Sequence, residues 1–172
     1  MKDYVVEMGG AALGARLRRL SAAIDADASR IYAARGIQFE QRWFGVINQL
    51  ALAGPLSVSQ LADVLGITHA SVSETRQSLE RAGLITAEAD RGDARRRVLA
   101  LSPSGQALVG RLRPLWDDFD EVARELDIEA GGVTEALARL EQALARTSLY
   151  ERLAATVQRR GIDDLAIRHS AD

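Results

Sequence analysis

The sequence predicts a mainly α-helical protein with a small β-wing, and three observations lead to this prediction. Two short helical patterns lie on either side of a tight glycine turn between residues 57 and 82. Two apolar runs suited to strands follow over residues 84–101, separated by an arginine-rich stretch. Long segments with apolar residues at helical spacing precede and follow this central part. The order helix, turn, helix, hairpin is that of a winged helix-turn-helix, here with long N- and C-terminal helices.

Two helices are expected before the central part. The first spans residues 11–34 and ends at Gly36, and its apolar residues recur at spacings of three and four. The second spans about residues 41–53 and is closed by Gly54 and Pro55. The apolar stripe of the first helix is Leu13, Leu17, Leu20, Ile24 and Ile31, and that of the second is Trp43, Val46, Ile47 and Leu50.

The central pair of helices has clear start and stop signals. Ser57 and Gln60 form a capping-box pattern, and Gly66 suits the left-handed residue that ends the first helix. Thr68 is a good N-cap for the second helix, which is expected from about His69 to Ala82 with Val72 and Leu79 in the core. Its outward residues are those that a recognition helix presents to a major groove, namely His69, Ser71, Ser73, Glu74 and Gln77.

The two strand patterns, residues 84–86 and 98–101, bracket a basic loop. Between residues 91 and 97 the chain has four arginines and one aspartate, whereas its total formal charge is −2. A hairpin tip with this charge suits phosphates or a narrow minor groove, where the negative potential of DNA is concentrated.

The C-terminal part is expected to hold two long helices. Ser102 can cap the first, Pro103 suits its first position, and Pro114 lies inside its heptad-like pattern. The pair Gly131 and Gly132 ends it. The last helix is expected over residues 133–160, although its apolar stripe changes phase near residue 147.

Composition excludes several classes of protein. At 172 residues the chain can bury a real core, and its near-neutral charge argues against indiscriminate coating of nucleic acid. It has no cysteine, so disulfides, thiolate metal sites and thiol redox sensors are excluded. His69 and His169 are far apart and lack acidic neighbours at ligand spacing, so no metal or cofactor is expected. No signal peptide or spanning segment is evident, which predicts a cytoplasmic protein with no membrane partner.

The central stretch resembles the MarR family of bacterial transcription regulators. The resemblance rests on Asp93 and Arg95 followed by Leu101, Ser102 and Gly105, and on the blocks at residues 39–44, 54–58 and 79–85. It implies a DNA-binding regulator without enzymatic activity, in which Arg95 enters the minor groove and Asp93 orients it. The residues expected to contact double-stranded DNA are Thr68, His69, Ser71, Ser73, Glu74, Gln77, Arg91, Asp93, Arg95, Arg96 and Arg97.

The family likeness also implies a homodimer and a small effector. Residues 1–40 would form an N-terminal dimerisation helix, residues 41–105 the DNA-binding domain, and residues 106–172 the C-terminal dimerisation helices and tail. The implied function is a ligand-responsive repressor acting on a pseudo-palindromic operator. A small aromatic or anionic effector would bind where the dimer helices meet the winged domain, next to Tyr32, Phe39, Arg42, Trp43, Trp116 and Phe119.

The chain departs from the family pattern in the recognition helix. Glu74 follows Ser73 where many members have an arginine, and Arg76 stands at a commonly apolar position, where it can pair with Glu80. The blocks at residues 16–21, 39–44 and 54–58 also resemble the MarR-like half of chains that are fused to an N-acetyltransferase domain. Two alternatives follow from the departure at Glu74 and from this second resemblance. One is a winged helix that has become a protein-interaction module, and the other is a stand-alone regulatory half of an N-acetyltransferase system.

Overall fold

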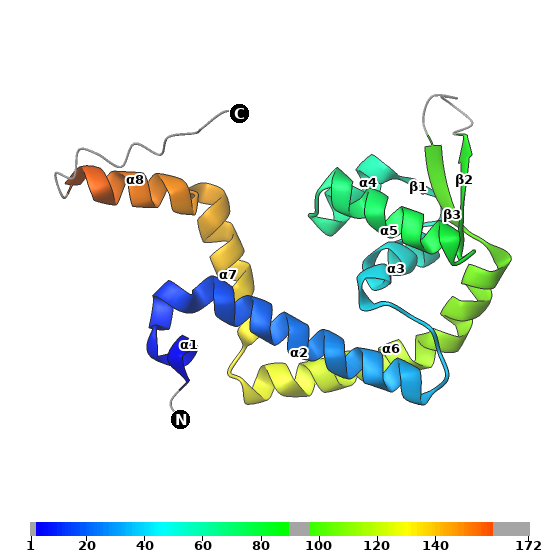
Figure 1. Cartoon of the computed structure of the whole chain (residues 1–172), viewed down its shortest axis with the longest axis horizontal. Helices are drawn as coiled ribbons and strands as arrows, with labels where there is room; N and C mark the ends of the chain where they lie inside the picture. The colour runs from blue at the N-terminus through cyan, green and yellow to red at the C-terminus, as the bar shows by residue number, and fades with distance from the viewer. Residues whose placement is uncertain (1–2, 90–96, 160–172) are drawn as a thin grey trace. The chain divides into compact units, whose positions relative to one another are not determined.

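The computed structural model describes residues 3–89 and 97–159 (Figure 1). The chain divides into two compact units, Met1–Arg113 and Pro114–Asp172. The central winged helix-turn-helix lies entirely within the first unit. The functional division at residues 40 and 105 stays a prediction, because compactness alone does not assign functions to regions.

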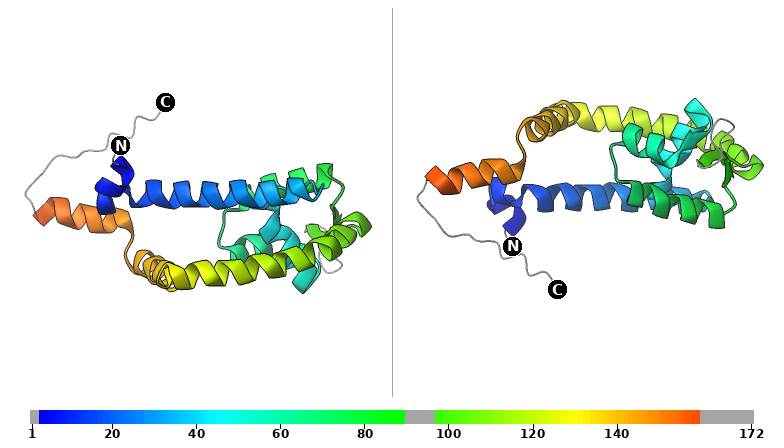
Figure 2. Two further views of the ribbon diagram at one scale, coloured as in Figure 1. Left: turned by 90° about the horizontal axis from the view of Figure 1, so that it is seen from below. Right: turned by 90° about the horizontal axis from the view of Figure 1, so that it is seen from above.

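The N-terminal helix is present and ends at the predicted residue, but it begins two residues later than predicted. The helix α2 spans Leu13–Ala34 and is uninterrupted in both views of Figure 2. Gly36 follows it with φ of 63°, a left-handed conformation that suits glycine. Two short elements that the sequence reasoning missed come before it, α1 (Tyr4–Glu7) and the 3-10 helix η1 (Gly9–Ala12). Asp3 caps α1 and pairs with Arg19 of α2 at 2.7 Å, and the Arg19 guanidinium lowers the pKa of that carboxyl.

The second predicted helix is present, with a 3-10 first turn. The element η2 covers Gln41–Trp43, and α3 covers Phe44–Ala53. Together with the helix-turn-helix they enclose the core of the first unit, because α3 contacts α4, α5 and the strand β3. The predicted apolar stripe of this segment is buried, since Trp43, Val46, Ile47 and Leu50 are all less than 7% exposed.

The wing is part of a three-stranded antiparallel sheet. Its strands are β1 (Leu56–Ser57), β2 (Ile85–Ala89) and β3 (Arg97–Leu101), in the order β1-β3-β2. Figure 1 shows the β2–β3 hairpin beside the helices α4 (Val58–Leu65) and α5 (His69–Arg81). The sequence predicted both hairpin strands but not β1, since two residues are too short to show a strand period. Leu56 pairs with Leu99 and thereby ties the start of α4 to the wing.

A tight junction joins the sheet to α6, which spans Pro103–Glu129. The Ser102 hydroxyl donates to the Gly83 carbonyl oxygen at 2.6 Å and accepts from the Gly105 amide at 3.0 Å, so it caps α6 as predicted. A side chain at Gly105 would have no room, because its Cβ would lie 2.1 Å from the Leu84 carbonyl oxygen. The serine and glycine of the family-like motif therefore have a packing role.

The prediction of one continuous helix over residues 133–160 was wrong. The structure has two helices, α7 (Val133–Arg146) and α8 (Leu149–Arg159), separated by Thr147 in an extended conformation. The break lies at the phase change near residue 147 that the sequence showed. By contrast, the predicted break at Gly131 and Gly132 is confirmed, because both have positive φ angles of 79° and 83°.

A second capping box explains the break after α7. The Ser148 amide donates to a Glu151 carboxylate oxygen at 2.7 Å, and the Glu151 amide donates to the Ser148 hydroxyl at 3.2 Å. The Ser148 hydroxyl also donates to the same carboxylate oxygen at 2.8 Å, and the hydrogen bonds from the Ser148 amide and hydroxyl hold the pKa of Glu151 below its ordinary value. Arg152 donates to the carbonyl oxygens of Thr147 and Ala143, which satisfies acceptors at the end of α7. The pattern Ser-x-x-Glu at residues 148–151 is the signal that could have located this helix start.

Candidate nucleic-acid interface

The turn between α4 and α5 has the geometry that its sequence predicted. The Ser57 hydroxyl accepts from the Gln60 amide at 3.2 Å, and the Gln60 side chain accepts from the Ser57 amide at 2.9 Å. Gly66 is left-handed with φ of 63° and ψ of 30°. Thr68 then caps α5 by accepting from the Ser71 amide at 3.1 Å. These three signals fix where each helix ends, and α4 and α5 pack directly on one another.

The helix α5 has one buried and one exposed face. Val72 and Leu79 are fully buried, as predicted, and Thr75 and Ser78 lie with them on the inner face. The predicted contact residues Thr68, His69, Ser71, Glu74 and Gln77 are exposed, and Ser73 is half-buried. The exposed set lies mainly on the first two turns of α5, so this end of the helix offers polar groups to a partner.

The hydrogen bonds within α5 show which of these groups are already engaged. The Thr68 and Ser71 hydroxyl oxygens lie 2.9 Å apart and share a hydrogen bond, so part of their hydrogen-bonding capacity is used within the helix cap. One Arg76 nitrogen donates to both carboxylate oxygens of Glu80 at 2.9 Å, which confirms the predicted pair. Among the described residues, no hydrogen bond or ion pair involves the side chain of Glu74 or Gln77. These two side chains are therefore available to an external partner.

Of the predicted wing residues, Arg97 is the one that the structure describes. Arg91, Asp93, Arg95 and Arg96 lie outside the described residues. Arg97 begins β3, where it is exposed and donates to the Ala87 carbonyl oxygen across the hairpin at 3.4 Å. The strands β2 and β3 pair from Ile85 and Leu101 to Ala89 and Arg97, so Arg97 lies in the last described pair of this hairpin.

A buried polar contact that was not predicted from the sequence holds the inner face of α5. The Ser78 hydroxyl is buried and accepts from the Trp43 indole nitrogen at 3.0 Å and from an Arg42 guanidinium nitrogen at 3.2 Å. Arg42 also donates to the Glu40 carboxylate at 2.6 Å. The signal was a serine on the buried stripe of a helix, because a buried hydroxyl requires a partner. This contact fixes α5 against η2.

Three of the predicted effector residues form an aromatic cluster within the first unit. The ring of Phe39 lies 4.9 Å from that of Tyr32 and 5.8 Å from that of Trp43, measured between ring centroids. All three residues are buried. Arg42 is engaged with Glu40 and Ser78 as described above. Trp116 and Phe119 lie on α6 in the second unit and are respectively buried and half-buried.

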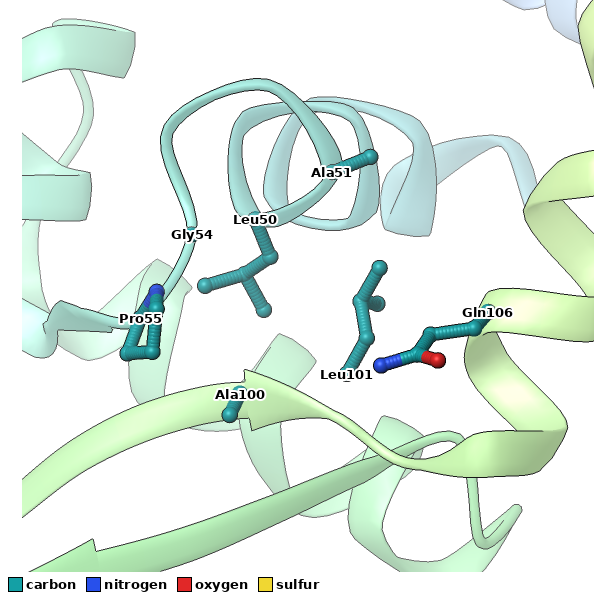
Figure 3. Close-up of a pocket in the computed structure, with 7 residues that line it drawn as sticks. All are labelled: Leu50, Ala51, Gly54, Pro55, Ala100, Leu101 and Gln106. Carbon is teal, nitrogen blue, oxygen red and sulfur yellow. The ribbon is translucent and has the colours of Figure 1, made fainter.

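Two open hollows lie on the first unit. The larger, of about 550 Å³, has Trp43 at its wall, Arg111 and Gln38 as polar groups, and mainly apolar residues elsewhere. Its lining residues are Gly36, Ile37, Gln38, Trp43, Ala82, Leu84, Ser104, Ala107, Leu108 and Arg111. The smaller, of about 320 Å³, lies where α3, Pro55 and the end of β3 meet, with Leu50 and Leu101 beside it (Figure 3).

Other kinds of site lack support in the described ranges. In residues 3–89 and 97–159, no three histidine, aspartate or glutamate side chains lie close enough together to hold a metal ion. The described helices also include none that is both long enough and apolar enough to cross a membrane.

A comparison with protein families identifies the segment that carries this geometry. Residues 36–96 match the model of the MarR family. The chain carries a MarR-family winged helix-turn-helix domain. Of the described elements, the matched segment includes η2, α3, β1, the helix-turn-helix and the strand β2. No curated protein sequence matches the chain.

The fold beyond this MarR-family segment also matches solved structures. A MarR/EmrR family transcriptional regulator from Acinetobacter sp. ADP1 aligns with a TM-score of 0.64 and 21% identity over 78% of this chain and 95% of its own. A mutant MarR from E. coli, complexed with operator DNA, aligns with a TM-score of 0.63 and 17% identity. The alignment covers 83% of this chain and 99% of the E. coli protein. MepR from S. aureus, solved in a complex with DNA, aligns with a TM-score of 0.62 and 22% identity. The alignment covers 74% of this chain and 94% of MepR. At these identities the likeness shows the fold.

Proposed function

We propose that this MarR-family chain is a homodimeric, sequence-specific DNA-binding transcription regulator that acts in the cytoplasm as a ligand-responsive repressor. The observation that carries the proposal is the exposed polar face of α5, where Glu74 and Gln77 are free of described partners beside a capped helix-turn-helix. A helix with this surface can place several hydrogen-bonding groups against base edges in a major groove. Two proteins of similar fold, from E. coli and S. aureus, were solved with DNA.

Uncovered apolar residues on α2 support the dimer. Four of the five residues of its predicted stripe are 38–65% exposed within the single chain, namely Leu13, Leu17, Leu20 and Ile24, and the fifth, Ile31, is half-buried. Leu149 and Leu153 on α8 are similarly uncovered, at 71% and 60%. An exposed stripe at heptad-like spacing is typical of a helix that packs against another helix. A second copy of the chain supplies that helix without any further partner.

A two-fold dimer predicts the form of the operator. Its two α5 helices would enter successive major grooves about 10 base pairs apart, so the operator would be a pseudo-palindrome. The wing arginines would bind flanking minor grooves or phosphates. In this arrangement the helix supplies sequence preference and the wing supplies most of the salt-dependent affinity.

The first test separates these two roles by substitution. Binding to the DNA upstream of its own gene is compared with binding to a scrambled duplex, at two salt concentrations. Arg95→Ala is expected to weaken binding to both duplexes and to reduce the salt dependence, because it removes a cation near phosphates. Gln77→Ala and Ser73→Ala are expected to reduce the preference between duplexes and to leave the salt dependence unchanged.

The control is light scattering on each variant, which should give the mass of a dimer throughout. Equal losses on every duplex for all three variants would contradict the division of roles. A wild-type dimer that binds neither duplex would favour a protein-interaction module or a regulatory half of an N-acetyltransferase system.

The larger hollow favours a small aromatic anion as the effector. Its volume of about 550 Å³ lies within the range of small-molecule sites, and its mostly apolar lining contains the Trp43 ring. Arg111 has no partner among the described residues, so its guanidinium can pair with a carboxylate. Trp43 also bonds to Ser78 of α5, so a ligand that moves the indole would act on the recognition helix. Only a ligand that prefers one arrangement can shift the equilibrium between two arrangements.

The test uses benzoate and its hydroxylated derivatives as probes. In a Trp116→Phe background, binding is expected to change the fluorescence of Trp43 and to release bound DNA. Arg111→Ala is expected to lower the affinity for the probe by about tenfold, since it removes a charge-assisted hydrogen bond. Arg18→Ala, on exposed α2, is the matched control and should bind the probe normally. If both variants bound the probe with equal affinity, Arg111 would not be part of the effector site.

A further inference from the structure

An acidic residue lies in the middle of the face of α5 that we assign to DNA. Glu74 is exposed and is followed by Gln77 on the same side of the helix, with Ser73 half-buried beside it. Its carboxylate has no hydrogen-bond or ion-pair partner among the described residues. A carboxylate on a surface that approaches polyanionic DNA is unfavourable unless it accepts hydrogen bonds there.

The neighbouring charges do not neutralise Glu74. Arg76 is the single arginine or lysine between residues 69 and 77, and both oxygens of Glu80 accept from it at 2.9 Å. Arg76 and Glu80 are each about 30% exposed, so the pair is partly shielded from water. Arg81 lies about two helical turns beyond Glu74, at the exposed C-terminal end of α5. The base-facing part of the helix therefore presents a free anion and neutral polar groups.

The base edges of the major groove differ in what they offer to a carboxylate. Guanine presents two acceptors, and thymine presents an acceptor and a methyl group. Adenine presents an amino donor beside the N7 acceptor, which repels a second acceptor group. Cytosine presents only its exocyclic amino donor. Of the four bases, cytosine is thus the one whose edge suits an unpaired carboxylate.

We propose that Glu74 is a specificity-determining residue that accepts a hydrogen bond from the exocyclic amino group of one cytosine in each half of the operator. This inference rests on the proposed function, since it needs α5 in the major groove. The charge of Glu74 has a second effect, on non-specific binding. The negative charge disfavours every approach to DNA that does not satisfy the carboxylate, so it lowers non-specific affinity.

The test is a binding selection from random duplexes, followed by measurement of Kd on the selected and on a scrambled duplex. Wild type is expected to select cytosine at one position in each half-site, and exchange of that base pair should cost about tenfold in affinity. Glu74→Ala should lose this preference and bind the scrambled duplex a few-fold more tightly, because a negative charge is removed. Glu74→Gln should move the preference towards adenine, whose N6 and N7 suit an amide.

The matched control is Glu125→Gln, which removes the same charge from an exposed position on α6 in the other unit. It should select the wild-type sequence with unchanged discrimination. All variants are compared by circular dichroism and mass, and Glu74 variants should stay folded dimers because the residue is exposed. A role in stability alone would lower the affinity for both duplexes together.

A modified base tests the hydrogen bond itself. The selected cytosine is replaced by a 2-pyrimidinone nucleotide, which keeps the ring and lacks the amino group. Wild type should lose about tenfold in affinity, and Glu74→Ala should lose almost nothing, so the two changes would be non-additive. Equal losses in both proteins, or a Glu74→Ala protein that selects the wild-type sequence, would overturn the inference and leave the proposed function intact. A wild-type protein that selects no sequence would overturn both.

Discussion

Gly105→Ala is expected to lower the free energy of unfolding by about 3 kcal/mol, because the new methyl group has no space. Its Cβ would lie 2.1 Å from the Leu84 carbonyl oxygen and 3.1 Å from the Leu84 carbonyl carbon. Both are backbone atoms, and the same oxygen accepts from the Ser102 amide at 3.0 Å. Relief of the clash would therefore separate α6 from β2. Chemical denaturation, with the unfolding midpoint as a second measure, would test this result.

Gly110→Ala is the matched control on the same helix. Its added Cβ would meet nothing within 4 Å, and α6 continues on both sides of the residue. Alanine is favoured over glycine in a helix interior by up to about 1 kcal/mol, so this variant should be slightly more stable than wild type. The two substitutions are thus expected to change the free energy of unfolding in opposite directions. A similar loss of stability in both would show that the contact at Gly105 is not the cause.

Placing two aspartates on the uncovered stripe of α2 is expected to dissociate the dimer and to reduce DNA affinity by about a hundredfold or more. Leu20 and Ile24 are 54% and 65% exposed in the single chain, so Leu20→Asp with Ile24→Asp should leave the monomer folded. Burying these carboxylates in a helix-to-helix interface would be strongly unfavourable. A monomer binds through one half-site and so loses the gain from simultaneous binding of both. Light scattering and a DNA titration measure the two effects.

Ala22→Asp with Ala26→Asp provides the same added charge elsewhere on α2. Each residue lies two positions beyond a member of the stripe, which places it on another side of the helix, and both are exposed. This control should remain a dimer and bind DNA nearly as wild type does. If the stripe variant also remained a dimer with normal DNA binding, α2 would not form the interface.

Much of the central fold was predictable from local signals. Ser57 with Gln60, Gly66 and Thr68 each act through contacts within a few residues, so capping and turn chemistry located both helices. The 3.6-residue period similarly placed Val72 and Leu79 in the core. Two local signals were nevertheless missed. The capping pair of Ser148 and Glu151 divides the last helix, and Asp3 caps a short one at the start.

The sequence alone also predicted the type of candidate site. Polar residues on one side of α5 and arginines between two strand patterns predict a surface for DNA without knowledge of distant contacts. The pair of Arg76 and Glu80 followed from their i,i+4 spacing for the same reason. These features depend on residues that are neighbours along the chain, so their spacing in sequence is nearly their spacing in space.

Only the tertiary structure decided which groups that are distant in sequence bond to one another. Ser78 bonds to Trp43 across 35 residues, and Ser102 bonds to Gly83 across 19, so no local pattern could reveal either pair. The sequence marks Gly105 only as part of the family-like motif, and its packing role follows from the position of the Leu84 carbonyl oxygen beside it. Long-range contacts depend on how the elements pack, and packing is set by the shape of the whole core.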